Sequence, residues 1–306
     1  MPDFNVINAE LRFPEGPVAM PDGSVILVEI AASRLSRVAP DGTISVVAET
    51  GGGPNGAAIG PDGRCYICNN GGMVFHERGG MCFPGHAAAD APTGWIEAVD
   101  LETGASEVLY RDCDGEPLRA PNDLVFDAEG GFWFTDHGKS REHDRDRGWI
   151  YYARPDGTMI RQVVRNLDGP NGIGLSPDGK TLYAVETVSG RVWSYDVTGP
   201  GEISKEPGPA PWVRGRLLAN PDGYHLFDSL AVDSAGNVCA GSIPGNITVI
   251  SPDGRTCEDV AMPDPFPTNI CFGGPDLRTA YITLSGAGKL VAMDWPRPGT
   301  PLNFLN

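Results

Sequence analysis

Long apolar runs and helical periodicity are both scarce in this chain of 306 residues. No window approaches the roughly 18 consecutive apolar residues that a membrane-spanning helix requires. Apolar residues rarely recur at the spacing of an amphipathic helix. The first residues, MPDFNVINAELRFPEG, lack the basic and apolar regions of an export signal. We therefore expect a soluble, cytoplasmic protein with no membrane partner.

Basic residues are few relative to acidic ones. The chain has 23 Lys and Arg against 40 Asp and Glu, a formal net charge of −17 at pH 7. Nucleic acids and anionic membranes are bound through Lys and Arg, so this balance argues against both partners. The acidic excess is compatible with binding a cation, although a solvated acidic surface accounts for most of the carboxylates.

Several catalytic and redox signatures are missing. There is no G-x-S-x-G, no P-loop and no G-x-G-x-x-G after a strand, which removes the commoner esterase, kinase and dinucleotide-binding interpretations. The seven Cys are an odd number without framework spacing and suit a reducing compartment. Cys65 and Cys68 stand in RCYICNN, which is typical of a strand, so their side chains should point to opposite faces. We expect packing thiols there, with a redox or zinc pair as the alternative.

Turn residues and short strands, in contrast, are abundant and ordered. Short runs such as SVILVEI, GFWFTD, TLYAVET and TAYITL are typical of strands, and each follows a turn. Six such turns recur along the chain: MPDG at 20, GPDG at 60, DAEG at 127, SPDG at 176, DSAG at 233 and GPDL at 274.

Each of these turns is preceded at a fixed distance by an oxygen-bearing side chain. Seven positions before the third turn residue stand Glu15, Asn55, Asn122, Asn171, Asp228 and Asn269. These residues are separated by 40, 67, 49, 57 and 41 positions, about the length of a four-stranded unit. The repeat predicts one all-β domain spanning residues 1–306, a six-bladed β-propeller.

In a propeller the innermost strand of each blade borders the central channel, so the six side chains should converge at one mouth of the axis. Carboxylate and amide oxygens without imidazole or thiolate are the ligands of a hard cation. We expect one divalent cation, Ca²⁺ first, with Mg²⁺ or Mn²⁺ possible and Zn²⁺ less suited. The alternative is that Asn and Asp only shape turns, but Glu15, in FPEGP, is not a turn residue.

Five segments carry a family resemblance. FPEGPVAMPDG, APNDLVFDAEGGFWFTD, GPNGIGLSPDGKTLYAVET, DSLAVDSAGNV and TNICFGGPDLRTAYIT resemble successive blade signatures of the regucalcin, gluconolactonase and luciferin-regenerating enzyme family, which includes senescence marker protein. The resemblance implies a propeller with a divalent cation at its axis and hydrolysis of lactones. It places the metal ligands at Glu15, Asn171 and Asp228, with Asn122 as a further ligand or substrate contact.

The chain departs from this family pattern near the third blade. Members that act on sugar lactones typically carry Arg two residues before the Asn of that blade, and here that position is Ala120, with Arg119 one residue earlier. This puts a sugar lactone in doubt as the substrate. Arg119, Asn55 and Asn269 remain candidates for substrate binding alongside Asn122.

The expected reaction is attack of water on a lactone carbonyl that the cation polarises. Asp228 is the first candidate for the general base, and His137, in FTDHG, is its rival. Asp136 and Glu186, expected at the ends of the innermost strands of blades three and four, should face solvent or hold ligand residues. The long segment 69–95 is a candidate lid or pocket wall. Two other functions stay open: a calcium-binding propeller without turnover, and hydrolysis of organophosphates or aryl esters. The sequence leaves the oligomeric state open.

Overall fold

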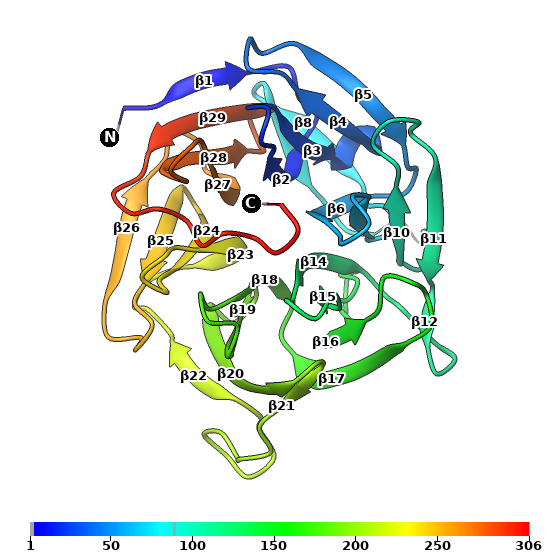
Figure 1. Cartoon of the computed structure of the whole chain (residues 1–306), viewed down its shortest axis with the longest axis vertical. Coiled ribbons are helices and arrows are strands. Elements are labelled where there is room, and N and C mark those ends of the chain that lie inside the picture. Colours follow the sequence, from blue (N-terminus) through cyan, green and yellow to red (C-terminus); the bar gives the residue numbers. More distant parts are fainter. Residues whose placement is uncertain (1–2, 88–89, 306) are drawn as a thin grey trace.

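Six antiparallel sheets surround a central axis in the computed structural model, which describes residues 3–87 and 90–305 (Figure 1). Each sheet has four or five strands and its innermost strand faces the axis. The predicted six-bladed propeller is therefore confirmed. Residues 88 and 89, within the segment expected to form a lid or pocket wall, lie outside the described residues.

The first three blades follow one another along the chain. Blade 1 contains β2 (Pro14–Ala19), β3 (Val25–Glu29), β4 (Arg34–Val38) and β5 (Ile44–Glu49), with the 3-10 helix η1 (Ile30–Ala32) after β3. Blade 2 contains β6 (Pro54–Ile59), β7 (Cys65–Asn69), β10 (Trp95–Val99) and β11 (Ser106–Tyr110). Blade 3 contains β14 (Pro121–Phe126), β15 (Phe132–Asp136), β16 (Gly148–Ala153) and β17 (Ile160–Leu167).

The last three blades complete the ring. Blade 4 contains β18 (Pro170–Leu175), β19 (Thr181–Glu186), β20 (Arg191–Gly199), β21 (Glu202–Ile203) and β22 (Arg216–Ala219). Blade 5 contains β23 (Leu226–Val232), β24 (Val238–Ile243), β25 (Asn246–Ile250) and β26 (Cys257–Ala261). Blade 6 contains β27 (Pro267–Gly273), β28 (Thr279–Leu284), β29 (Lys289–Asp294) and, as its outermost strand, β1 (Asn5–Asn8).

Blade 6 closes the propeller by joining the two ends of the chain. β1 pairs antiparallel with β29, with Asn5 opposite Ala292, so an N-terminal strand completes a sheet built from the C-terminal part of the sequence. Closing the ring in this way leaves the blades with short, protected edges.

The six repeated turns connect the first and second strands of the six blades, as the sequence pattern predicts. The longest spacing between repeats arises in blade 2, which carries an inserted hairpin, β8 (Phe75–Arg78) and β9 (Met81–Pro84). The small hairpin of β12 (Asp112–Cys113) and β13 (Glu116–Pro117) follows the same blade. The second-longest spacing arises in blade 4, where β20 extends outward to pair with β21.

The hydrophobic core lies between the blades. Six clusters of buried side chains form, and each draws its members from two neighbouring blades. Cys65 and Cys68 are fully buried, free thiols that belong to two different clusters, one on each face of β7. They pack as expected for thiols on opposite faces of a strand.

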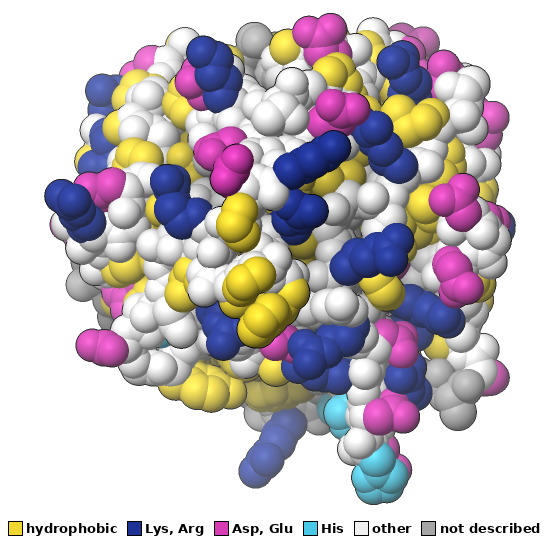
Figure 2. Space-filling model, turned by 90° about the horizontal axis from the view of Figure 1, so that it is seen from below, with side chains coloured by type: hydrophobic (Ala, Val, Ile, Leu, Met, Phe, Trp, Pro, Cys, Tyr) yellow, Lys and Arg dark blue, Asp and Glu magenta, His cyan; other side chains and the backbone are white. Residues whose placement is uncertain are grey.

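Charged side chains of both signs cover the outside. On the face drawn in Figure 2, Lys and Arg are interspersed with Asp and Glu, so the acidic excess is not concentrated there. No helix among the described residues has the length and apolar character needed to cross a membrane.

Candidate active site

The six repeated side chains stand near the starts of the six innermost strands, at one end of the axis. Five of them are buried and retain at most 6% of their accessible surface: Glu15, Asn55, Asn122, Asn171 and Asn269. Asp228, on β23, is only partly buried. The predicted ring of oxygen-bearing side chains is therefore present in the fold, and we refer to these six residues as the axial ring.

Each innermost strand departs from regular pairing where it contributes to the axial ring. All six ladders between first and second strands shift register at or beside the ring residue, for example between Glu15 and Val18 and between Pro170 and Ile173. Such irregularities turn side chains away from the normal alternation and are common next to active sites.

Three ring residues are each followed by a glycine, because a larger residue would not fit there. A Cβ on Gly16 would lie 2.6 Å from the carbonyl oxygen of Asn55, and one on Gly56 would lie 2.6 Å from that of Asn122. A Cβ on Gly172 would lie 2.6 Å from the backbone nitrogen of Leu230. Neighbouring innermost strands approach each other so closely that only glycine fits. Each repeated Gly-Pro-Asn-Gly segment thus supplies an oxygen-bearing ring side chain and, in its second glycine, a tight contact between strands.

In four blades, the side chain of the last residue of the second strand binds the backbone of the segment just before the ring residue. Backbone N–H groups two or three residues before the ring residue donate to these side chains. The pairs are Arg12 to Glu29 (2.8 Å), Gly53 to Asn69 (2.8 Å), Ala120 to Asp136 (2.7 Å) and Asp168 to Glu186 (2.6 Å). The expectation that Asp136 and Glu186 face solvent is wrong, because both are buried. They hold backbone in place, and no hydrogen bond among the described residues joins them to a ring side chain.

Hydrogen bonds also connect the ring residues to one another. The Asn269 amide donates to Glu15 Oε2 at 2.7 Å, and the same oxygen accepts the N–H of Gly16 at 2.6 Å. The Ser229 hydroxyl donates to Asn171 Oδ1 at 3.4 Å. Ser229, which takes the place of a glycine after Asp228, therefore contacts the ring residue of blade 4.

Three oxygens of the ring are buried without a hydrogen-bond donor. They are Glu15 Oε1, Asn55 Oδ1 and Asn122 Oδ1. A buried acceptor without a partner costs about 1–3 kcal/mol, and native proteins rarely retain several at one place. Acceptors that lack donors are what a hard cation would satisfy, so the donor set fits a divalent ion.

The axial ring holds too few carboxylates to bind an ion through charged groups alone. Within residues 3–87 and 90–305, no three His, Cys, Asp or Glu side chains are grouped as a metal site would require. A cation at the axis would therefore depend on the amide oxygens of the ring.

One carboxylate next to the ring escaped the sequence analysis. Asp123 follows Asn122 and occupies the position that is glycine in three other blades. Its side chain accepts the N–H of Leu124 at 2.9 Å and that of Ile173, on the next blade, at 3.3 Å. It therefore links blades 3 and 4 at the level of the ring. The sequence feature that could have revealed Asp123 is a departure from the repeat, because Asn-Asp stands where other blades have Asn-Gly.

Burial raises the pKa of the carboxyl groups around the axis. Burial raises the pKa of Glu15 to about 7, against hydrogen bonds from Asn269 and Gly16 that lower it. For Asp123, burial and then the charge of Glu15 raise the pKa to about 8. The same two causes raise the pKa of Asp228. The described residues form no ion pair with any of these three carboxylates, so the region lacks positive charge that a cation would supply.

His137 lies beside blade 4. Its Nδ1 is 3.0 Å from the carbonyl oxygen of Gly138. Because a carbonyl only accepts, Nδ1 carries the hydrogen and Nε2 of the neutral ring is an acceptor. A Cβ on Gly169, two residues before Asn171, would lie 2.9 Å from Nε2. Burial lowers the pKa of His137, so the ring is neutral at pH 7.

Arg119 is half-buried and lies in the segment before β14. Its backbone N–H donates to Asp136 at 2.7 Å. Ala120, the next residue, is buried and brings no polar side chain to this side of the ring.

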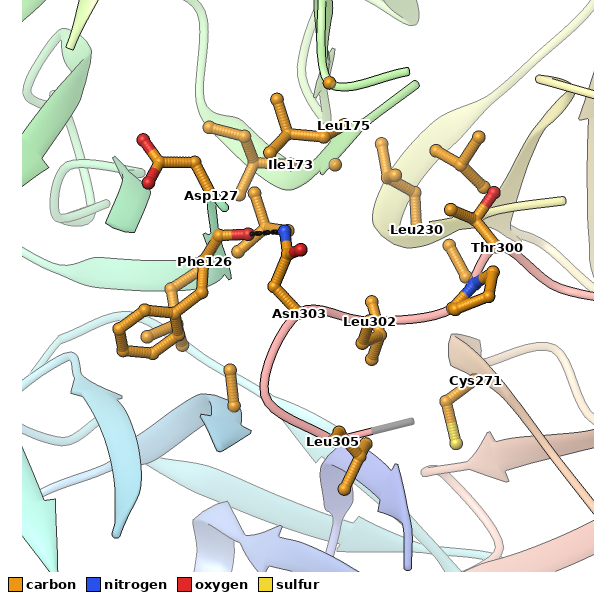
Figure 3. A pocket seen from close by; sticks show the side chains of 18 of the residues that line it. Phe126, Asp127, Ile173, Leu175, Leu230, Cys271, Thr300, Leu302, Asn303 and Leu305 are labelled. Carbon is orange, nitrogen blue, oxygen red and sulfur yellow. Dashed lines mark hydrogen bonds between the residues drawn. The ribbon is translucent and has the colours of Figure 1, made fainter. Parts of the chain in front are cut away.

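An apolar chamber of about 460 Å³ lies beyond the ring along the axis (Figure 3). All six innermost strands line it, through Val18, Ile59, Phe126, Leu175, Val232 and Phe272 among others. The C-terminal segment 300–305 crosses it, and the Asn303 amide donates to the carbonyl oxygen of Phe126 at 3.0 Å. Asp123 also borders the chamber, so low polarity on that side contributes to the raised pKa of the carboxylate.

Comparison with known proteins agrees with this architecture. The model of the SMP-30/Gluconolactonase/LRE-like region matches residues 13–286. The chain is 26% identical to a gluconolactonase of Zymomonas mobilis over 92% of this chain and 79% of that protein. It is 29% identical to diisopropyl-fluorophosphatase of Loligo vulgaris over 69% of this chain and 68% of that protein. The crystal structure of a calcium-binding regucalcin from Agrobacterium tumefaciens superimposes with a TM-score of 0.76, at 17% identity, over 99% and 97% of the two chains.

Proposed function

Because the chain belongs to the SMP-30/gluconolactonase/LRE-like family, we propose that it is a divalent-cation-dependent hydrolase that opens lactones. The observation that carries the proposal is the group of three buried ring oxygens without donors, beside carboxyl groups whose raised pKa marks a shortage of positive charge. Relatives named as lactonases support the reaction class.

The cation would be held by Glu15, Asn122, Asn171 and Asp228. When bound, a divalent ion supplies positive charge that polarises a carbonyl oxygen and stabilises the oxyanion of the tetrahedral intermediate. Asn55 and Asn269 complete the ring, and with Asn122 and Arg119 they are the proposed contacts for the substrate. Ca²⁺ is the first choice, because carboxylate and amide oxygens are its usual ligands.

Water must lose a proton as it attacks the carbonyl carbon, and two groups compete for that role. Asp228 is a partly buried carboxyl group of the ring, and burial with the charge of Glu15 raises its pKa, which makes the carboxylate a stronger base. His137 presents Nε2 as an acceptor close to the strand that carries Asn171. We favour Asp228, which belongs to the ring itself. Segment 300–305 lines the chamber on the other side of the ring, so we place the entry of substrate and water on the ring side.

A chelator test decides the proposal. Protein stripped of divalent ions should lose hydrolysis of a panel of lactones and regain it with Ca²⁺, Mg²⁺, Mn²⁺ or Zn²⁺ added singly. Asp228→Asn should lower kcat/KM by about 10²–10⁴-fold if Asp228 is the base. The control Asp178→Asn, in an exposed turn, should leave it unchanged. Full hydrolysis in the stripped protein would reject the proposal.

The pH profile separates the two bases. If His137 takes the proton, kcat/KM should rise with pH below about 6.5 and then level off. The reason is that the lowered pKa of His137 leaves its imidazole neutral, and able to accept a proton, above that pH. His137→Gln should then remove this rise and most of the activity. Retained activity in His137→Gln excludes His137 as the base. Loss of activity in an Asp228→Asn variant that still binds Ca²⁺ then assigns the role to Asp228, whereas loss together with Ca²⁺ binding would show only its role as a ligand.

A phosphotriester is the second candidate substrate. The diisopropyl-fluorophosphatase of Loligo vulgaris is similar over two thirds of the chain. A cation that polarises a carbonyl oxygen can also polarise a phosphoryl oxygen. Diisopropyl fluorophosphate and aryl esters therefore belong in the same panel. A calcium-binding propeller without turnover would bind the ion and hydrolyse none of them.

A further inference from the structure

The hairpin inserted in blade 2, β8 and β9, does not pack on its own blade alone. The backbone N–H of Cys82 donates to the carbonyl oxygen of Gly286, in blade 6, at 2.8 Å. Phe75 packs against Phe13, before blade 1, with ring centroids 5.1 Å apart. In Figure 1 the hairpin lies beside blade 1, across the side of the axis where blades 6 and 1 meet. It therefore contacts blade 1, which adjoins its own blade, and blade 6, which does not.

Two of the aromatic residues that meet the hairpin directly precede the innermost strand of their blade. Phe13 directly precedes Pro14 of β2, and Phe266 directly precedes Pro267 of β27. Their rings are 6.5 Å apart, and Phe83 of the hairpin meets Phe266 edge-on at 5.4 Å. We call Phe13, Phe75, Phe83 and Phe266 the aromatic cluster.

The aromatic cluster stands close to the axial ring. Phe13 is two residues from Glu15 and Phe266 is three from Asn269, so both aromatic residues directly precede strands that carry ring residues. The backbone turns at Phe13, whose φ is +55°. The hydrogen bond between Asn269 and Glu15 joins the two strands at that level. Phe13 is buried, whereas Phe83 and Phe266 keep part of their surface exposed. The cluster thus offers apolar surface beside the place where a lactone carbonyl would bind.

We propose that the aromatic cluster determines specificity by binding an apolar substituent of the lactone, so that alkyl- and aryl-substituted lactones are preferred over polyhydroxylated ones. This inference rests on the proposed function. Phenylalanine rings gain from burying methylene groups and provide no partner for hydroxyl groups, which would lose hydrogen bonds to water there. Water adds across the acyl–oxygen bond, and the product is a hydroxy acid that carries the same substituent.

The first test is a substrate series with calcium-loaded wild-type protein: γ-butyrolactone, γ-hexanolactone, γ-decanolactone and glucono-δ-lactone. We expect kcat/KM to rise by about two- to fourfold per methylene through the alkyl series, mainly through KM. Glucono-δ-lactone should be the poorest substrate. Equal kcat/KM along the alkyl series, or a preference for glucono-δ-lactone, would overturn the inference while leaving lactone hydrolysis intact. If no lactone is hydrolysed, the proposed function fails as well.

The second test uses the partly exposed Phe83. Phe83→Ala should reduce the increase in kcat/KM from γ-butyrolactone to γ-decanolactone by about tenfold and leave kcat/KM for γ-butyrolactone unchanged. Phe83→Leu should keep most of that increase. Trp212→Ala, which removes an aromatic side chain that is 84% exposed in the blade 4 extension, is the matched control. An equal loss on every substrate in Phe83→Leu, or an undiminished gain in a folded Phe83→Ala, would contradict a specificity role.

Discussion

At the scale of single residues, Glu15 is the most informative side chain of the site. It is buried, it accepts two hydrogen bonds through Oε2, and its Oε1 has no donor. Its pKa is raised from 4.5 to about 7, so the folded state binds more protons than the unfolded state between those values. Stability of the metal-free protein must fall as pH rises through that window. If Glu15 is a cation ligand as we propose, it lowers the stability of the metal-free protein for the sake of function, as residues of functional sites commonly do.

Glu15→Gln should therefore have opposite effects on stability and on cation binding. In the metal-free protein at pH 8 we expect Tm to rise by about 2–6 °C. The substitution removes the buried charge, while the glutamine has nearly the same shape and its carbonyl oxygen can still accept the hydrogen bonds from Asn269 and Gly16. At pH 5 the two proteins should differ little. Added Ca²⁺ should raise Tm of the wild type and not of the variant, as thermal unfolding by circular dichroism would show.

Glu102→Gln, in an exposed turn of blade 2, is the control and should behave as the wild type under all these conditions. A calcium-induced rise of equal size in Glu15→Gln and the wild type would contradict a ligand role for Glu15.

At the scale of elements, the close contact between innermost strands sets the size of the ring. Gly172 of β18 leaves no room for a side chain beside Leu230 and Asp228 of β23. The contact holds two ring residues, Asn171 and Asp228, on adjacent strands. Any side chain at this position would separate these strands and widen the ring.

Gly172→Ala should cost about 1–3 kcal/mol of the free energy of unfolding, as overpacking does elsewhere. It should also weaken Ca²⁺ binding, because the strands of blades 4 and 5 must move apart. Urea unfolding and calcium titration would measure both effects. Gly199→Ala is the matched control, since a Cβ there would come no closer than 3.7 Å to another atom. No loss in either measurement would show that the strand contact is not rigid.

The repeat in the sequence was sufficient to predict these six strands and the ring residue on each, because turn and ligand positions keep one spacing. It could not reveal the register shifts at the ring, which depend on pairing between strands. The roles of Asp136 and Glu186 were also hidden, since their backbone partners belong to segments 16–18 residues earlier. Segment 69–95 was recognisable as a long segment, but the hairpin β8–β9 within it was not, and its contacts with Phe13 and Phe266 arise only when the propeller closes.

At the scale of the whole molecule, the propeller brings Glu15, Asp123 and Asp228 from three blades to one end of a channel whose other end is apolar. Each of the three carboxyl groups has a raised pKa, caused first by burial and, for Asp123 and Asp228, next by the charge of Glu15. Near pH 7 the metal-free site therefore holds protons. A divalent cation needs deprotonated ligands, so its binding must release protons.

Calorimetric titration of Ca²⁺ into the metal-free protein at pH 7, repeated in two buffers of different ionisation enthalpy, tests the cation site most directly. The account predicts one ion bound per chain, with release of protons that diminishes as the titration is repeated toward pH 9. Absence of binding by Ca²⁺, Mg²⁺, Mn²⁺ and Zn²⁺ alike, or binding without any proton release at pH 7, would contradict it.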